Sequence, residues 1–88
     1  MQIRVRLGAG LSRFAGSPLL ALELPEGGSV EDLYAVIGEH YPELAPALPS
    51  ALPVVAGMHV ERETALHPGD EVALLIPVTG GAGPMRGA

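Results

Sequence analysis

The chain has 88 residues and a formal net charge of −5, its basic side chains other than histidine are five arginines, and it contains no cysteine and no lysine. A chain of this length builds one domain with one small core. Its longest apolar run is much shorter than the about 20 residues that cross a bilayer. Its arginines are too few and too dispersed to neutralise a nucleic-acid backbone. We therefore expect a small soluble, cytoplasmic protein that binds neither nucleic acid nor membrane and has no disulfide, thiolate metal site or thiol nucleophile.

The first third of the chain indicates two strands joined by a wide loop. Residues 2–7 alternate polar and apolar side chains, which is the pattern of a half-buried strand. Leucine recurs at every second position of residues 20–24, and glycine and proline in residues 8–10 and 16–18 indicate the loop between them. These patterns predict an antiparallel hairpin.

One helix is predicted to begin after Ser29. The Ser29 side chain can accept a hydrogen bond from the backbone N–H of Asp32 while the Asp32 carboxylate reaches back, and Glu31 is favoured at the positive end of the helix dipole. Apolar residues then recur at helical spacing up to Tyr41, where the following proline disfavours continuation. We predict at most one irregular helical turn in the proline-rich residues 43–53.

The second half of the chain indicates further strands. Residues 54–56 and 58–60 have the pattern of a short strand interrupted at Gly57. Residues 67–70, with the sequence HPGD, predict a tight turn in which proline presets φ and glycine supplies a positive φ. The apolar run within residues 71–78 lacks alternation, which predicts a central strand covered at least in part on both faces.

The order of the predicted elements indicates the fold. In a single small sheet the helix must cover one face, and the last strand can lie parallel to the first through a right-handed crossover. We therefore predict an α+β fold of the β-grasp, or ubiquitin-like, type: a mixed four- to five-stranded sheet with one main helix packed on one face. Residues 1–79 are assigned to this domain and residues 80–88 to a flexible C-terminal arm and tail.

Few side chains are spaced for catalysis or metal binding. Three histidines fall on separate predicted elements: His40, His59 and His67. None has the spacing of two ligands on one element, so we interpret them as surface or capping residues. Glu61 and Glu63 would share one face of a strand, which formally allows an acid/base pair, although a solvated strand edge is favoured.

The glycine pair Gly80-Gly81 follows the last predicted strand. A glycine pair near a terminus is commonly a flexible linker. Alternatively it forms a thin arm, because residues without a Cβ atom can thread a narrow channel in another enzyme and an unhindered glycine carboxylate is easily adenylated and attacked. The residue pattern leaves both interpretations open. A phosphate-binding glycine loop is disfavoured because residues 82–88 are too few to build the helix that such a loop needs.

Three stretches resemble the MoaD/ThiS-like sulfur-carrier family, which includes the small subunit of molybdopterin synthase and the thiamine sulfur carrier: IRVRLGAGLSRFAG, GGSVEDLYAVIGEHYPEL and TALHPGDEVALLIPVTGG. The last is the most specific, because it combines a Gly-Asp-Glu-Val turn, an apolar strand, Pro-Val and a diglycine at the family's spacing. The resemblance covers residues 1–81. The long segment between the helix and the third strand makes the chain more similar to the molybdopterin-synthase subunit.

The resemblance implies a carrier protein, at most a non-catalytic subunit of a sulfurtransferase, that binds no cofactor or metal itself. An E1-like adenylyltransferase would use ATP to adenylate the carboxylate of Gly81, and sulfur would replace AMP to give a thiocarboxylate. A sulfur-accepting enzyme, the large subunit of molybdopterin synthase or an analogue, would then use this sulfur. The diglycine arm implied by the resemblance consists of Val78, Thr79, Gly80 and Gly81.

Two features depart from the family pattern. Gly8 stands where family members often carry an aromatic residue, so we expect a partner contact there to be weakened or replaced. Family members generally end at the second glycine, whereas here seven residues follow and Gly81 is joined to Ala82. Some relatives depend on a JAMM-type metalloprotease to remove such an extension, which predicts a processing site between Gly81 and Ala82. A non-covalent β-grasp interaction module and a ubiquitin-like protein modifier are the alternatives.

Overall fold

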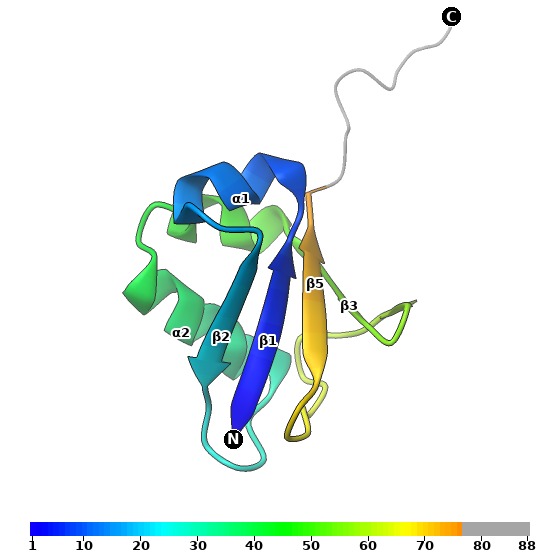
Figure 1. Cartoon of the computed structure of the whole chain (residues 1–88). Coiled ribbons are helices and arrows are strands. Elements are labelled where there is room, and N and C mark those ends of the chain that lie inside the picture. The colour runs from blue at the N-terminus through cyan, green and yellow to red at the C-terminus, as the bar shows by residue number, and fades with distance from the viewer. Residues whose placement is uncertain (77–88) are drawn as a thin grey trace, which may run out of the picture.

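The computed structural model describes residues 1–76. Its elements follow in this order: β1 (Gln2–Leu7), α1 (Ala9–Ala15), β2 (Leu19–Glu23), α2 (Val30–His40), the 3₁₀-helix η1 (Ala45–Ser50), β3 (Leu52–Val55), β4 (Met58–His59) and β5 (Glu71–Leu75). Figure 1 shows α1 lying across the ends of β1 and β2, at the end of the molecule opposite the N-terminus.

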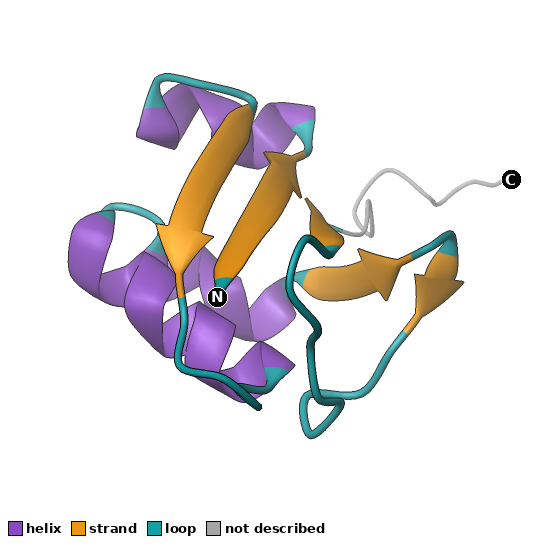
Figure 2. Cartoon of the chain, turned by 60° about the horizontal axis from the view of Figure 1, so that its bottom comes forward, coloured by secondary structure: helices purple, strands orange, loops and turns teal. Residues whose placement is uncertain are grey.

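The five strands form one mixed sheet in the order β2-β1-β5-β3-β4. The central strand β5 runs parallel to β1 and antiparallel to β3, while β1 and β2 form an antiparallel pair. Figure 2 shows α2 against one face of β1 and β2, with the hairpin of β3 and β4 at the far edge of the sheet. This arrangement confirms the predicted α+β fold of the β-grasp type.

The core lies between the sheet and α2. Alternate side chains of β1 are buried, as its pattern predicted, and Val72 and Leu74 of β5 are completely buried beside them. Leu33 and Ile37 of α2 meet these strands and are also completely buried. Each such side chain contributes about 1.5–3 kcal/mol relative to an exposed position, so this layer dominates the stability of the domain.

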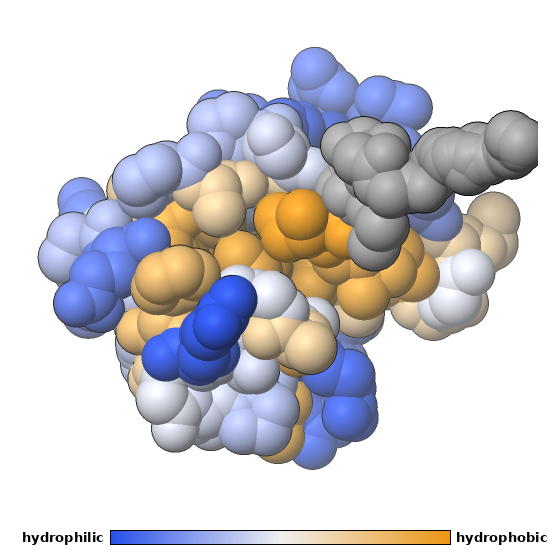
Figure 3. All heavy atoms as spheres, turned by 90° about the horizontal axis from the view of Figure 1, so that it is seen from above, coloured by the Kyte–Doolittle hydropathy of each residue, from blue (hydrophilic) through white to orange (hydrophobic). Residues whose placement is uncertain are grey.

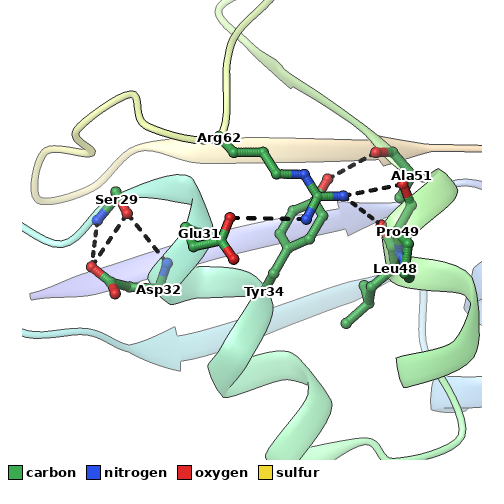
Figure 4. A network of polar contacts seen from close by, with 8 residues as sticks. All are labelled: Ser29, Glu31, Asp32, Tyr34, Leu48, Pro49, Ala51 and Arg62. Atoms are coloured by element: carbon green, nitrogen blue, oxygen red, sulfur yellow. Dashed lines mark hydrogen bonds and ion pairs between the residues drawn. The ribbon is translucent and has the colours of Figure 1, made fainter.

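The predicted capping box of α2 is present. The Asp32 N–H donates to Ser29 Oγ at 3.3 Å, and the Ser29 N–H donates to Asp32 Oδ2 at 2.9 Å (Figure 4). The HPGD turn is also confirmed, because the Asp70 N–H donates to the His67 carbonyl at 3.0 Å and Gly69 has a φ of 84°. Local sequence signals therefore identified both of these boundaries correctly.

The wide loop predicted after β1 is wrong in part, because it contains α1. This short helix is held by Leu11, which is 1% exposed, and it ends at Gly16 in the left-handed conformation. The segment before β3 likewise contains a 3₁₀-helix of six residues, η1, about two turns where at most one was predicted. In both cases burial of a leucine stabilises a helix that its glycines or prolines disfavour.

The interrupted strand predicted near Gly57 is two strands of a hairpin. Ala56 and Gly57 have φ values of 53° and 78°, and β3 and β4 pair across them. Positive φ at both central residues is the geometry of a tight two-residue hairpin turn. Glu61 and Glu63, which were predicted to share a strand face, instead lie in a turn closed by the Thr64 N–H on the Glu61 carbonyl.

β5 was predicted to be covered at least in part on both faces, and the structure shows that this coverage is unequal. Val72 and Leu74 point toward α2, whereas Leu75 is 46% exposed and Ala73 is partly exposed on the other face. The apolar run therefore includes two outward residues, Ala73 and Leu75, on a face that no element within residues 1–76 covers. That outward face is therefore a candidate functional surface.

Candidate functional site

The predicted arm and processing residues lie outside residues 1–76: Val78, Thr79, Gly80, Gly81 and Ala82. Their roles therefore stay predictions. The structure describes the chain up to Ile76, the residue after β5, and so shows the surface from which the arm segment continues.

The last residues of β5 are held from both sides. On one side the Gly8 N–H donates to the Leu74 carbonyl at 3.0 Å. On the other side Leu52 of β3 is the register partner of Leu75. Because the strand is paired with two neighbours up to its end, the sheet determines where the chain leaves the domain.

Large apolar side chains are exposed at this end of the sheet. Leu52, Leu75 and Ile76 are 39%, 46% and 37% exposed, and we name these three residues the apical patch. Figure 3, which looks down on this end, shows apolar surface gathered there. A contiguous exposed apolar surface on a small protein typically marks a binding site for a partner.

Gly8 borders the apical patch. A Cβ atom built on Gly8 would lie 3.4 Å from the Leu74 carbonyl oxygen and 3.8 Å from Leu75 Cδ2. Leu75 therefore lies against the position where a side chain of residue 8 would begin. The surface beside this position is formed by Leu75, an aliphatic residue.

The open face of the sheet below the patch carries opposite charges. Arg6 Nε lies 2.7 Å from Glu71 Oε2, and Arg4 Nη2 lies 3.7 Å from Glu71 Oε1. Both arginine side chains are more than half exposed, so each pair contributes at most about 1 kcal/mol. These three residues leave a charge of +1 on this face, whereas residues 1–76 as a whole carry ten carboxylates and four arginines, a net charge of −6.

A second polar cluster was not predicted from the sequence. The Arg62 guanidinium lies 4.4 Å from the centre of the Tyr34 ring, and its Nη2 donates to the carbonyls of Leu48 and Pro49, each at 3.1 Å (Figure 4). The Tyr34 hydroxyl donates to the Ala51 carbonyl at 3.1 Å. These bonds hold the segment that leads into β3, and with it the strand that carries Leu52.

The surroundings of the Tyr34 phenol raise its pKa, so it stays neutral over an even wider pH range than a free phenol. Burial raises the pKa of Tyr34 above its ordinary value of 10.0, the positive charge of Arg62 lowers it, and Glu31 raises it. The phenol is therefore a hydrogen-bond donor at physiological pH. No sequence signal identified this cluster, because its members are distant along the chain.

The three histidines lie apart: His40 at the end of α2, His59 on β4 and His67 in the HPGD turn. All three are exposed. Among the described residues, no three histidine or carboxylate side chains come close enough together to hold a metal ion. Of the helices in the same part of the chain, none is long and apolar enough to cross a bilayer.

The family of the chain follows from its sequence. The model of the ThiS family matches residues 5–81. The chain therefore belongs to the ThiS family, that is, to the ThiS/MoaD-like sulfur carriers, which are typically non-catalytic proteins. A search of curated protein sequences found no match.

Solved structures with the same fold carry two kinds of description. The small archaeal modifier protein 1 of Methanosarcina acetivorans is 28% identical, with a TM-score of 0.79 over 91% of this chain and 96% of that one. A putative molybdopterin converting factor, subunit 1, of Pyrococcus furiosus is 26% identical, with a TM-score of 0.80 over 89% of this chain and 99% of that one. The chain is thus similar both to a protein modifier and to a molybdopterin-related subunit.

A third structure contains a partner. It is a complex of subunits 1 and 2 of the molybdopterin-converting factor of Helicobacter pylori, and the matched chain is 21% identical, with a TM-score of 0.68 over 92% of this chain and all of that one. At this identity the likeness shows the fold alone. It does show that the same fold occurs in a protein complex of that kind.

Proposed function

We propose that the chain is the precursor of a sulfur carrier whose active form ends at Gly81. The observation that carries this proposal is the extent of the family match, which ends at residue 81 although the sequence continues for seven residues. The match therefore stops at the residue whose carboxylate would be activated. The fold supports the proposal in one respect: the paired central strand β5 ends at Leu75, three residues before the arm in the sequence.

The proposed chemistry begins with release of the Gly81 carboxylate. A JAMM-type metalloprotease would hydrolyse the peptide bond between Gly81 and Ala82 with one water molecule, which leaves a carboxylate on Gly81 and an amine on Ala82. An E1-like adenylyltransferase would then join this carboxylate to the α-phosphate of ATP and release pyrophosphate. A sulfide-level nucleophile would displace AMP to give the thiocarboxylate.

The chain itself would supply position and recognition, with no bound cofactor, in the cytoplasm. β5 would present the arm, Val78 to Gly81, to the partner enzymes, and the apical patch would offer an apolar surface on which the activating enzyme can dock. Because the chain has no cysteine, the carboxyl end is the position available for carrying sulfur. The acceptor would be a sulfur-accepting enzyme such as the large subunit of molybdopterin synthase or an analogue.

Intact mass spectrometry of the protein from its native cell tests the proposal. We expect a species that ends at Gly81 and that has gained the mass of sulfur in exchange for one oxygen. In the chain ended at residue 81, Gly81→Ala should reduce adenylation strongly because the added methyl group crowds the reacting carboxylate. Gly83→Ala in the full chain makes the same change within the tail and should leave processing and activation as in the unmodified protein. Finding full-length protein alone under sulfur-demanding growth would contradict the proposal.

A protein modifier is the second candidate, and the likeness to the small archaeal modifier protein 1 favours it. In this case the activated Gly81 would form an isopeptide bond with a lysine of another protein. The chain contains no lysine, so it could not form lysine-linked chains with itself. Peptide mass spectrometry should then find the Gly81 carboxyl group on lysines of other proteins. If neither this product nor a thiocarboxylate appears, and the full chain binds its partner as well as the truncated chain does, a non-covalent interaction module is the better account.

A further inference from the structure

A hollow lies on the open face of the sheet, below the apical patch. It has a volume of about 350 Å³ and is lined by residues of β3, of β5 and of the turn between β3 and β4: Val54, Ala56, Gly57, Glu71 and Ala73. Val54 and Ala73 are register partners, and the next outward positions on the same two strands are Leu52 and Leu75. The hollow is therefore continuous with the apical patch, and we name it the sheet hollow.

Small side chains leave the sheet hollow open. Ala73 carries only a methyl group and Gly57 has no side chain, so the space between β5 and the β3–β4 turn is not filled from within the domain. Covering apolar surface yields about 25 cal/mol for each Å² removed from water. An apolar side chain of a partner that enters the hollow would gain this free energy.

Two arginine side chains of β1 lie beside the sheet hollow. Arg6 is the register partner of Ala73, and Arg4 is the register partner of Glu71. The Arg6 Nε donates to Glu71 Oε2 at 2.7 Å, which orients the guanidinium. Within residues 1–76 no group accepts a hydrogen bond from the Arg6 Nη atoms, and the side chain is 62% exposed. These N–H groups are therefore available to a carboxylate from outside, in the paired geometry that guanidinium and carboxylate groups favour.

The charge of the domain limits the kind of partner that fits. Residues 1–76 carry a net charge of −6, so a polyanion such as a nucleic acid is repelled. Locally, Arg4, Arg6 and Glu71 together leave a charge of +1, which matches a single carboxylate. A partner surface that is basic overall, and that carries one carboxylate next to an apolar side chain, is complementary to both charges.

We propose that the sheet hollow binds an apolar side chain of the activating enzyme and that Arg6 binds a carboxylate next to that side chain. The inference rests on the proposed function in one respect, because the activating enzyme is taken to be the partner that docks on this domain. The apical patch and the sheet hollow then form one docking surface along β5 and β3. The apolar contacts supply affinity, and the ion pair fixes the register in which the enzyme lies on the sheet.

The ion pair is tested by titration calorimetry of the chain ended at Gly81 with the E1-like adenylyltransferase of the same cell. Arg6→Gln should raise Kd about tenfold, because it leaves the carboxylate of the enzyme without its partner. Arg13→Gln is the matched control: it removes the same charge from the exposed surface of α1, and it should change Kd less than about twofold. The effect of Arg6→Gln should persist at high salt, since a pair enclosed in an interface is screened little.

The hollow is tested by filling it. Ala73→Leu should raise Kd about tenfold, because the added side chain occupies the space that the enzyme would use. Ala21→Leu is the matched control, since it makes the same change on the open face of β2, on the other side of β1 from the hollow. Its Kd should stay within about twofold of that of the unmodified chain. Amide spectra of the unbound variants establish that each one is folded.

The outcomes separate this inference from the proposed function. Equal Kd values for Arg6→Gln and Arg13→Gln, an unchanged Kd for Ala73→Leu, or no binding of the unmodified chain would overturn the inference. Adenylation of Gly81 is measured separately, by the release of pyrophosphate. Adenylation combined with Kd values that do not depend on Arg6 or Ala73 would overturn the inference alone. Binding that depends on both residues, without adenylation, would support the inference and contradict the proposed function.

Discussion

Tyr34 combines a buried ring with a hydroxyl that donates to the Ala51 carbonyl at 3.1 Å. Burial raises the pKa of its phenol above 10.0, with the Arg62 charge acting in the opposite direction. The folded protein therefore holds the phenolic proton more tightly than the unfolded chain does. The resulting stabilisation is complete below the unfolded pKa of about 10 and is lost as the pH rises through the folded pKa.

We expect Tyr34→Phe to lower the free energy of unfolding by about 1 kcal/mol at neutral pH, because the Ala51 carbonyl loses its partner. The same change should make the loss of stability above about pH 10 less steep, since the buried phenol no longer ionises. Thermal unfolding followed from about pH 7 to about pH 11 measures both effects. Tyr41→Phe, at the end of α2, is the control, and an alkaline loss as steep in Tyr34→Phe as in the unmodified protein would contradict the prediction.

Among the elements, α1 shows how tertiary contacts override a local signal. Its seven residues include Gly10, and Gly8 and Gly16 flank it, so its propensity is poor. Burial of Leu11 against the core and the left-handed cap at Gly16 stabilise it nevertheless. A helix of seven residues with a single buried side chain shows no helical periodicity in its sequence. The sequence therefore predicts a loop at this position.

The segment between β4 and β5 is joined to α2 by backbone hydrogen bonds, among them the Glu31 N–H on the Arg62 carbonyl, and the Arg62 side chain joins it to Tyr34 and η1 as well. We expect Arg62→Ala to lower the free energy of unfolding by about 2 kcal/mol, because it removes two hydrogen bonds and the stacking on Tyr34. Urea unfolding measures this loss. Arg13→Ala is the matched control: its guanidinium lies 5.8 Å from the ring centre of the exposed Phe14, and its removal should cost less than about 0.5 kcal/mol. Equal losses in the two variants would show that the Arg62 contacts do not stabilise the fold.

At the scale of the whole molecule, two adjacent leucines of β5 have different expected roles: Leu74 stabilises the fold, and Leu75 is available to bind a partner. Leu74 is completely buried toward α2, whereas Leu75 is 46% exposed on the open face. We expect Leu74→Ala to cost about 3 kcal/mol in unfolding free energy and Leu75→Ala less than about 1 kcal/mol.

Leu75→Ala should nevertheless weaken binding of the chain ended at Gly81 to its activating enzyme. Loss of the apolar contact is worth about 1 kcal/mol, or about a fivefold rise in Kd, which titration calorimetry can measure. Leu19→Ala is the control, since Leu19 is similarly exposed, at 45%, on the edge strand β2, which β1 separates from β5. Similar Kd values for Leu75→Ala and the unmodified chain would show that the apical patch is not part of the docking surface.

Much of the fold was predictable because its signals are local. Alternation in β1 follows from the two-residue repeat of a strand, and the Ser29–Asp32 capping box and the HPGD turn need only neighbouring residues. The predicted chemistry also needs no tertiary contact. The sequence has no cysteine thiol and no lysine amine, and it therefore predicts the Gly81 carboxylate as the reactive group.

The sequence by itself thus determined the order of the main elements and the fold class, and it predicts the carboxyl end as the place for chemistry. Only the tertiary structure decided that the outward face of β5 is open, that Leu75 lies beside Gly8 and that Arg62 stacks on Tyr34. An apolar run predicts that a strand is buried, but it does not indicate which of the two faces of the strand is covered. Contacts between residues distant along the chain arise when sheet and helices pack together, because packing selects among partners that no local repeat distinguishes.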